Sequence, residues 1–412
     1  MRGCCLTLSL LVGSTLPGSA AAEEPPPAQD CLLPRTAPGI CKRPLPAGYL
    51  SKPPLKELPK YVAGSGAQWQ VDLRGRDVSS LDLKDRTGDL LHADFDSNTV
   101  FPKTLPKGFD PKRIMDLGAD PGLGVRTLHK AGITGKGVAI AIIDQALLVD
   151  HEDYAARLRS YEELQWISPE AQMHGGALAS IAVGKRGGVA PEADVYFTAA
   201  WFAETVNGRS QPSYFTLAKA IDRVIELNRT LPKGRKIRAL AIARGFTPGE
   251  RGYAEVTDAV GRAKAEGIFV ISSSLKDHYG LEFHGLGREP MSAPDAQASY
   301  LPGAWWQYRF FASGQGSSTQ TLLVPMDSRT TASPTGPADY VFYREGGWSW
   351  AIPYIAGAYA LACQVRPDIT PERFWKLALE TGDAATVTHD EKKRRLERIM
   401  NPAGLIRRLK AP

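Results

Sequence analysis

Four stretches of near-continuous apolar residues constrain the fold of this chain more than any other feature. They are "GVAIAIID" (137–144), "ADVYFTAAW" (193–201), "IRALAIARG" (237–245) and "GIFVISSS" (267–274). Amphipathic stretches of helical length, 213–229 and 255–267, lie between them. Apolar strands that alternate with amphipathic helices predict a mostly parallel sheet that is buried on both faces. We therefore expect an α/β fold with three layers, α/β/α, over the larger part of the chain.

The remainder of this region and the C-terminus supply further elements. The apolar runs 321–326 and 340–345 lead into an apolar helix near residue 350, and 371–382 predicts another helix. The most basic cluster, "EKKRRLER" (391–398), is interleaved with acids, which is typical of a solvated helix face. Because the net charge is only +6 over 412 residues, we expect no nucleic-acid partner.

The N-terminus has the order of a secretory signal peptide. One arginine, a short apolar run and a series of small residues ending at Ala22 predict that residues 1–22 are removed on export. A membrane anchor is the alternative, but the apolar run is short for a spanning helix. No later stretch is long and apolar enough to cross a bilayer, so we expect a secreted or periplasmic protein without stable membrane insertion after cleavage.

Residues 23–107 differ in composition from the rest and predict an irregular, Pro-rich leader and possible pro-region. Ten of the 31 prolines fall between residues 23 and 60. In "VDLRGRDVSSLDLKD" (71–85) an Asp followed by an apolar residue recurs every five positions, which is similar to a few pentapeptide-repeat coils or to a turn-rich edge of a pro-region. We expect the α/β domain over 108–385 and a basic tail over 386–412.

Cysteine usage fits an exported chain. Cys31 and Cys41 bracket a short loop and could form a disulfide or remain free thiols; export favours the disulfide. Cys363 lies in the apolar helix and is expected to pack in the core. No Cys-x-x-Cys pair is present, which argues against a structural zinc site.

Three residues at element boundaries could carry chemistry. Asp144 ends the first apolar strand, where active sites of parallel sheets gather. His174 precedes two glycines at the start of a stretch of small residues, and Ser349 follows Gly346 and Gly347 at the start of an apolar helix. Each residue alone is more often structural, as a turn Asp, a packed His or a helix-start Ser. Together they give the chain order Asp, His, Ser.

These segments resemble the subtilisin-like serine proteases, or subtilases, over residues 110–385. "GKGVAIAIID" is similar to the family's Asp segment, and "HGGALASIAVGKRGGVAPEADVYFTAAW" resembles its His segment and the strand after it. In "GWSWAIPYIAG" the matching positions are Gly347, Ser349, Ala351, Pro353, Ala356 and Gly357. The resemblance implies a catalytic triad of Asp144, His174 and Ser349 that hydrolyses peptide bonds in protein or peptide substrates through an acyl-enzyme.

The sequence departs from the family in the region of the oxyanion hole. "GIFVISSSLKD" lacks the family's asparagine, and its place falls to Lys276, so Lys276 and Ser274 are the candidate donors. Family members often bind calcium, but Asp153 is the single carboxylate here that could be carried over as a ligand. We therefore expect no certain cofactor, and calcium by resemblance only.

Three functions can be compared on these residues. An exported serine endopeptidase is favoured because the nucleophile and the base are both present. A catalytically impaired binding protein of the same fold is the alternative, since the oxyanion region is unusual. An acyl hydrolase of the α/β-hydrolase type is disfavoured, because the Gly-x-Ser-x-Gly motif is absent and the order of the triad differs.

Overall fold

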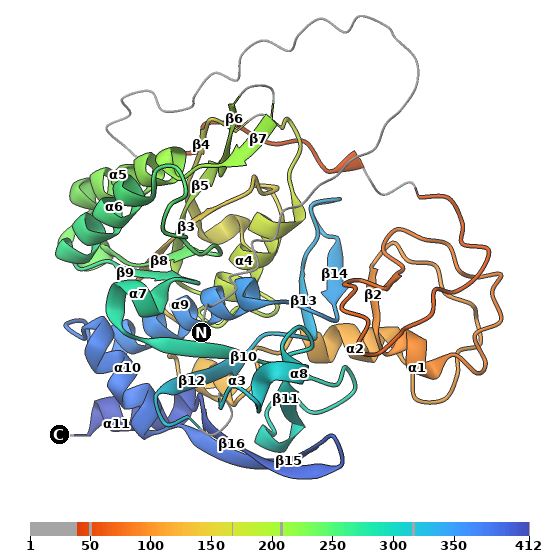
Figure 1. The fold of residues 1–412 in the computed structure, drawn as a ribbon. Helices are drawn as coiled ribbons and strands as arrows, with labels where there is room; N and C mark the ends of the chain where they lie inside the picture. The colour runs from red at the N-terminus through yellow and green to blue at the C-terminus, as the bar shows by residue number, and fades with distance from the viewer. Residues whose placement is uncertain (1–38, 49–51, 167, 207–208, 315–317, 412) are drawn as a thin grey trace, which may run out of the picture.

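The computed structural model describes residues 39–48, 52–166, 168–206, 209–314 and 318–411 (Figure 1). The predicted signal peptide, residues 1–22, and Cys31 lie outside the described residues. Cys41 is disulfide-bonded, and its pairing with Cys31 stays a prediction. Cys363 is buried as a free thiol, as expected for a core position.

A five-stranded sheet forms the centre of the molecule, with strand order β4-β5-β3-β8-β9 and every neighbouring pair parallel. Its strands are β3 (Ala139–Asp144), β4 (Leu158–Leu164), β5 (Asp194–Ala200), β8 (Ile237–Ile242) and β9 (Phe269–Ser272). The four apolar runs form four of these strands, as predicted. Sequence patterns missed β4, because it carries Glu162 and Glu163. Glu162 is buried at the sheet edge and forms an ion pair with Arg223 at 2.8 Å.

Alternating residues of the central strand β3 build the two faces of this sheet. Ala139, Ala141 and Ile143 pack in the core formed with helices α5 (Phe215–Thr230) and α6 (Tyr253–Ala265). Ile140 and Ile142 face the opposite core, which includes helices α4 (Met173–Val183) and α9 (Trp348–Val365). Figure 1 shows α5 and α6 side by side on one side of the sheet. The predicted three-layer α/β/α fold is therefore confirmed.

A second five-stranded sheet, in the order β11-β10-β12-β16-β15, incorporates the C-terminal residues. Its strands are β10 (Glu282–Arg288), β11 (Tyr300–Pro302), β12 (Thr321–Pro325), β15 (Asp383–His389) and β16 (Lys392–Ile399). The prediction of a basic tail over 386–412 was wrong, and so was the prediction of a helix over 391–398. The basic residues lie in β16, whose Leu396 and Ile399 are fully buried in the main core. Charged residues dominate this strand because it lies on the protein surface apart from those apolar positions.

The described N-terminal residues form a small core of their own around the sheet β1-β2-β14-β13. Its strands are β1 (Val71–Asp72), β2 (Ala93–Asp96), β13 (Arg329–Ala332) and β14 (Tyr340–Tyr343). The five-residue period is structural: Leu73, Val78 and Leu83 are all buried. The preceding aspartates each accept a backbone N–H two residues further on, at 2.9–3.1 Å. This part of the predicted irregular leader is therefore ordered, and it is joined to the rest by the pairing of β2 with β14.

The remaining elements are short or peripheral. They are α1 (Thr87–Leu90), α2 (Pro111–Gly118), α3 (Val125–Lys130), β6 (Ala203–Val206), β7 (Arg209–Pro212), α7 (Leu275–Tyr279), α8 (Gln307–Phe310), α10 (Pro371–Glu380) and α11 (Pro402–Lys410). The helix predicted over 371–382 corresponds to α10. Among the helices of the described residues, none combines the length and the apolarity that a membrane span needs.

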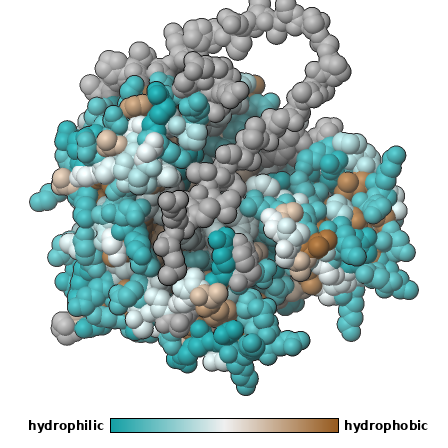
Figure 2. All heavy atoms as spheres, viewed as in Figure 1, coloured by the Kyte–Doolittle hydropathy of each residue, from teal (hydrophilic) through white to brown (hydrophobic). Residues whose placement is uncertain are grey.

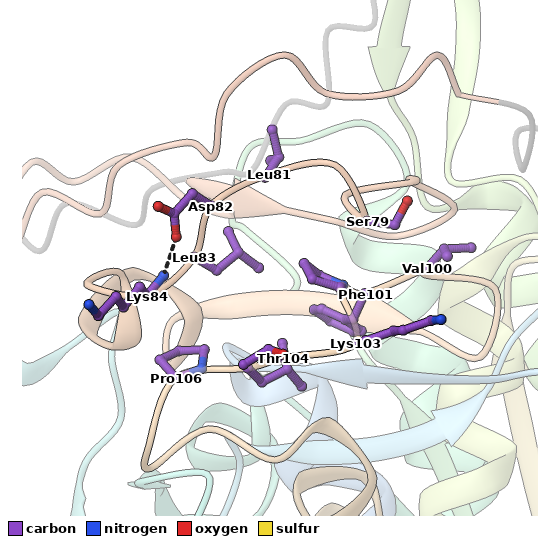
Figure 3. A pocket seen from close by; sticks show the side chains of 12 residues that line it. Ser79, Leu81, Asp82, Leu83, Lys84, Val100, Phe101, Lys103, Thr104 and Pro106 are labelled. Carbon is purple, nitrogen blue, oxygen red and sulfur yellow. Dashed lines mark hydrogen bonds between the residues drawn. The ribbon is translucent and has the colours of Figure 1, made fainter.

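The N-terminal part also carries an open hollow of about 760 Å³ (Figure 3). It is lined by residues 79, 81–84 and 100–106, among them the exposed Val100. Lys84 and Lys103 lie at its margin, where the Lys84 backbone N–H is held by Asp82. On the face seen in Figure 2, hydrophobic residues form scattered spots on a mostly hydrophilic described surface.

The burial of Leu396 predicts that the C-terminal hairpin is required for stability. Leu396→Ala should lower the free energy of unfolding by about 2–5 kcal/mol, because it leaves a cavity in the main core. Arg395→Ala, one residue away on the exposed face of β16, should change it by less than about 0.5 kcal/mol. Chemical denaturation of both variants measures the difference, and equal unfolding midpoints would contradict the integrated C-terminus.

Candidate active site

Asp144 lies at the carboxyl end of the central strand β3 and is almost fully buried. Its Oδ1 accepts the backbone N–H of Gln145 at 2.7 Å. An ionised carboxylate in this position needs further hydrogen bonds, because burial without partners is costly. The carboxylate therefore needs a second donor besides the Gln145 N–H.

His174 supplies the missing partner from the first turn of α4. Its Nδ1 lies 2.7 Å from Asp144 Oδ1, and its side chain is 24% exposed while that of Asp144 is 2% exposed. With Nδ1–H donated to the carboxylate, the neutral imidazole has its lone pair on Nε2. In this arrangement Nε2, on the side of the ring away from Asp144, can act as a base.

A close approach of the backbone holds α4 over the end of β3. The Gln172 N–H, just before the helix, donates to Ala146 O at 2.7 Å. At Gly175, an added Cβ would lie 2.0 Å from Gln145 O, which is closer than any side chain permits. The glycine after the histidine is thus required for the contact between His174 and Asp144.

Ser349 lies at the first turn of α9, directly after a turn that only glycine can form. Gly347 adopts φ 68° and ψ 179°, a conformation essentially restricted to glycine. At Gly346 a Cβ would meet Met326 O at 2.4 Å. Backbone N–H groups in a first helical turn lack intrahelical acceptors, so the Ser349 N–H is oriented to bind an anion.

The structure brings these three elements to one place, but not into one hydrogen-bonded chain. Helix α9 packs against α4, and the Trp350 ring lies 5.3 Å from that of His174. Among the described residues, His174 bonds to Asp144, and no hydrogen bond joins it to Ser349. Hydrogen bonds of this kind are often long in the absence of substrate.

An aromatic cluster beside the serine was not expected from the sequence. Trp348 packs against Phe283, His284 and Trp306, with ring centroids 5.4–5.6 Å apart. Burial lowers the pKa of His284 to about 4, so this imidazole is neutral near pH 7. Trp306 is distant in sequence, and no motif marks it.

The predicted role of Lys276 was wrong. A donor to an oxyanion would have to be partly desolvated, yet the Lys276 side chain is 68% exposed and pairs with Glu282 at 2.7 Å. The hydrogen bond to Glu282 raises the pKa of this ammonium group. Lys276 is thus part of an exposed ion pair of α7.

The Ser274 hydroxyl makes hydrogen bonds to the backbone of Phe246. Its buried Oγ accepts the Phe246 N–H at 2.9 Å and donates to Phe246 O at 3.2 Å. This hydroxyl joins the loops after β8 and β9, and its single proton is already donated. The prediction of Ser274 as an oxyanion donor was therefore wrong as well.

Asp153 does not fit the role of a calcium ligand. It is buried, and its oxygens accept the Arg186 N–H at 2.8 Å and the Ser180 hydroxyl. Burial raises the pKa of Asp153. Within the described ranges no group of three or more His, Cys, Asp or Glu side chains is placed to hold a metal ion.

The backbone contact at Gly175 predicts that alanine is far less tolerated at position 175 than at position 176. Gly175→Ala should displace α4, break the bond between His174 and Asp144, and lower the free energy of unfolding by about 1–3 kcal/mol. Gly176→Ala is the control, since its Cβ would lie no closer than 3.4 Å to Tyr154 Oη. The downfield proton resonance of His174 Nδ1–H reports the bond; its persistence in Gly175→Ala would contradict the assignment.

Comparisons with known proteins agree with the motifs. Residues 135–324 match the model of the subtilase family; this segment contains Asp144 and His174, and Ser349 lies beyond it. The subtilisin-like protease PopC of Myxococcus xanthus (strain DK1622) is 31% identical over 97 residues, which span 20% of this chain and 20% of that protease.

Two solved structures cover most of the chain. The prenylagaramide maturation protease PagA is 15% identical, with a TM-score of 0.47, over 70% of this chain and 98% of its own. The PatG macrocyclase domain is 17% identical, also with a TM-score of 0.47, over 70% of this chain and 95% of its own. The resemblance seen in the sequence is confirmed by the family match, which covers residues 135–324, and the 97 residues matched to PopC span about a fifth of that protease.

Proposed function

We propose that this chain is an exported serine endopeptidase that hydrolyses protein or peptide substrates through Asp144, His174 and Ser349. The observation that carries the proposal is the 2.7 Å bond between the buried Asp144 and Nδ1 of the partly exposed His174. Because Nδ1 faces Asp144 and the side chain of His174 is 24% exposed, the proposal assigns Nε2 to the proton transfer from the nucleophile. The match of residues 135–324 to the subtilase family model supports the same chemistry.

The reaction follows from the positions of these groups. Ser349 Oγ attacks the carbonyl carbon of the scissile bond while His174 Nε2 takes the hydroxyl proton, and Asp144 stabilises the imidazolium. When the C–N bond breaks, His174 returns this proton to the leaving amine, and an ester to Ser349 remains. His174 then takes a proton from water as the water oxygen attacks the ester carbonyl. The ester C–O bond breaks while His174 returns this proton to Ser349 Oγ, which releases the acid.

Charge on the tetrahedral oxygen is stabilised at the start of α9. The Ser349 N–H and the positive end of this helix favour negative charge there. Because Lys276 and Ser274 are engaged elsewhere, neither supplies a second donor. This favours a slower enzyme, and it is the observation behind the alternative, a catalytically impaired binding protein.

Export is part of the proposal. A disulfide at Cys41 is expected in an oxidising compartment, which agrees with the signal peptide predicted over residues 1–22. The proposed partners are protein or peptide substrates and not nucleic acids. No step of the proposed reaction requires a metal ion.

Labelling with a fluorophosphonate probe tests the function directly. The full chain should be labelled at Ser349, and Ser349→Ala, His174→Ala and Asp144→Asn should each lose most labelling and most peptide hydrolysis. The double variant Ser349→Ala/His174→Ala should lose no more hydrolysis than either single variant, because the two residues act in the same step. Absence of labelling in the folded wild type would favour the impaired binding protein.

Lys276→Ala provides a separate prediction. Since this side chain lies in an exposed ion pair, its removal should leave kcat for peptide hydrolysis unchanged within a factor of about 2. A donor to the oxyanion would instead cost roughly 10²–10³ in kcat. Steady-state kinetics on a short peptide distinguishes these results, and Glu282→Ala, which removes the other partner of the pair, is the matched control.

A further inference from the structure

Of residues 344–346, which lead to Ser349 through Gly347, two are held by buried acids and the third is itself a largely buried acid. The Arg344 N–H donates to Asp94 Oδ1 at 2.8 Å, and the Gly346 N–H donates to Asp327 Oδ1 at 2.9 Å. Glu345, between them, accepts the indole N–H of Trp305 at 3.0 Å. The proposed triad uses none of these acids, although they surround the segment that presents its nucleophile.

Asp327 has the most direct connection to the serine. It follows β12, is 2% exposed, and uses both carboxylate oxygens for backbone N–H groups. Oδ1 binds the Gly346 N–H, and Oδ2 binds the Ala304 N–H at 2.8 Å. One carboxylate therefore ties the nucleophile turn to the loop that carries Trp305 and Trp306.

The bond to Asp327 adds to the close packing of the turn against Met326 and Trp350. Gly346 and Gly347 have no side chains to pack, and glycine has the greatest backbone freedom of any residue. The bond from the Gly346 N–H fixes this turn two residues before α9 begins. A small displacement here moves Ser349 relative to His174, and reacting groups tolerate little misplacement.

The charged groups around Asp327 come from several elements. Arg344 favours its ionised form, while Glu289 and Glu345 oppose it. A cavity of about 80 Å³ adjoins Asp327 and is lined by further titratable or charged residues: Tyr61, His92, Arg288, Glu289, Arg344 and His389. Most of the residues that line this cavity are polar or charged.

We propose that Asp327 is a positioning residue for Ser349, whose ionised carboxylate fixes the turn 345–347 and whose protonation loosens it. The ionised form accepts both N–H groups through charge-assisted bonds, while a protonated carboxyl group accepts them more weakly. The inference rests on the proposed function, because it concerns the reactivity of the same serine.

The pKa values indicate that Asp327 gains its proton slightly below neutral pH. Burial raises the pKa of Asp327 to about 6 and that of Glu345 to about 7. Because these values are raised, the fold gains stability as pH falls through them, whereas the anchoring of the turn by a charged acceptor is lost. Activity and stability should therefore change in opposite directions on acidification.

The pH dependence of probe labelling at Ser349 and of kcat tests the proposal on the full chain. In the wild type the loss of the ionised Asp327 adds to the loss of the free base of the proposed triad, so log kcat should fall on the acid side with a slope greater than 1 as Asp327 is protonated. Asp327→Asn cannot ionise, so it should give a slope near 1. It should also lower kcat at pH 8 roughly 10- to 100-fold with little change in KM.

Asp153→Asn is the matched control, because Asp153 is also buried, has a raised pKa and accepts a backbone N–H, but not from the nucleophile turn. Asp153→Asn should therefore show the same steep fall of log kcat on the acid side as the wild type. A wild type that labels with a slope of 1, or an Asp327→Asn variant with unchanged kcat and slope, would overturn the inference and leave the proposed function intact. A folded wild type without labelling would overturn both. If Asp327→Asn fails to fold, the wild-type slope alone decides.

Discussion

The hydrogen bond between Asp144 and His174 is the interaction on which the site depends. It exists because an apolar strand, buried on both faces, ends in a carboxylate that needs a partner. The helix that supplies the partner can approach only because residue 175 is glycine. The same contact satisfies a buried charge and orients a base, so stability and proposed chemistry rest on one arrangement.

The proposed nucleophile is held in place by different contacts. Ser349 follows a turn of two glycines, and that turn is held by acids from distant parts of the chain: Asp94 from β2 and Asp327 after β12. The N-terminal part thus contributes a strand to the sheet whose strand β14 leads into the serine. A segment that the sequence suggested as an irregular leader thus contacts the strand that leads to the proposed nucleophile, Ser349.

Several predictions were wrong for one shared reason. The helix over 391–398 and the donor role of Lys276 were inferred from local pattern and from position in a motif. Whether a charged residue lies in a strand or faces solvent depends on its neighbours in space. Lys276 has Glu282 beside it, and the basic strand has the apolar Leu396 and Ile399 to bury.

The sequence by itself determined the α/β layers, four central strands and the positions of Asp144, His174 and Ser349 at element boundaries, because period, burial and glycine placement are local properties. The motifs also gave the resemblance to subtilases that the family match over residues 135–324 confirms. Only the tertiary structure decided what surrounds the serine: the aromatic cluster at Trp348, the ion pair of Lys276 and the anchors at Asp94 and Asp327. These depend on contacts between residues far apart in the chain, and no local pattern encodes which distant carboxylate a backbone N–H will meet.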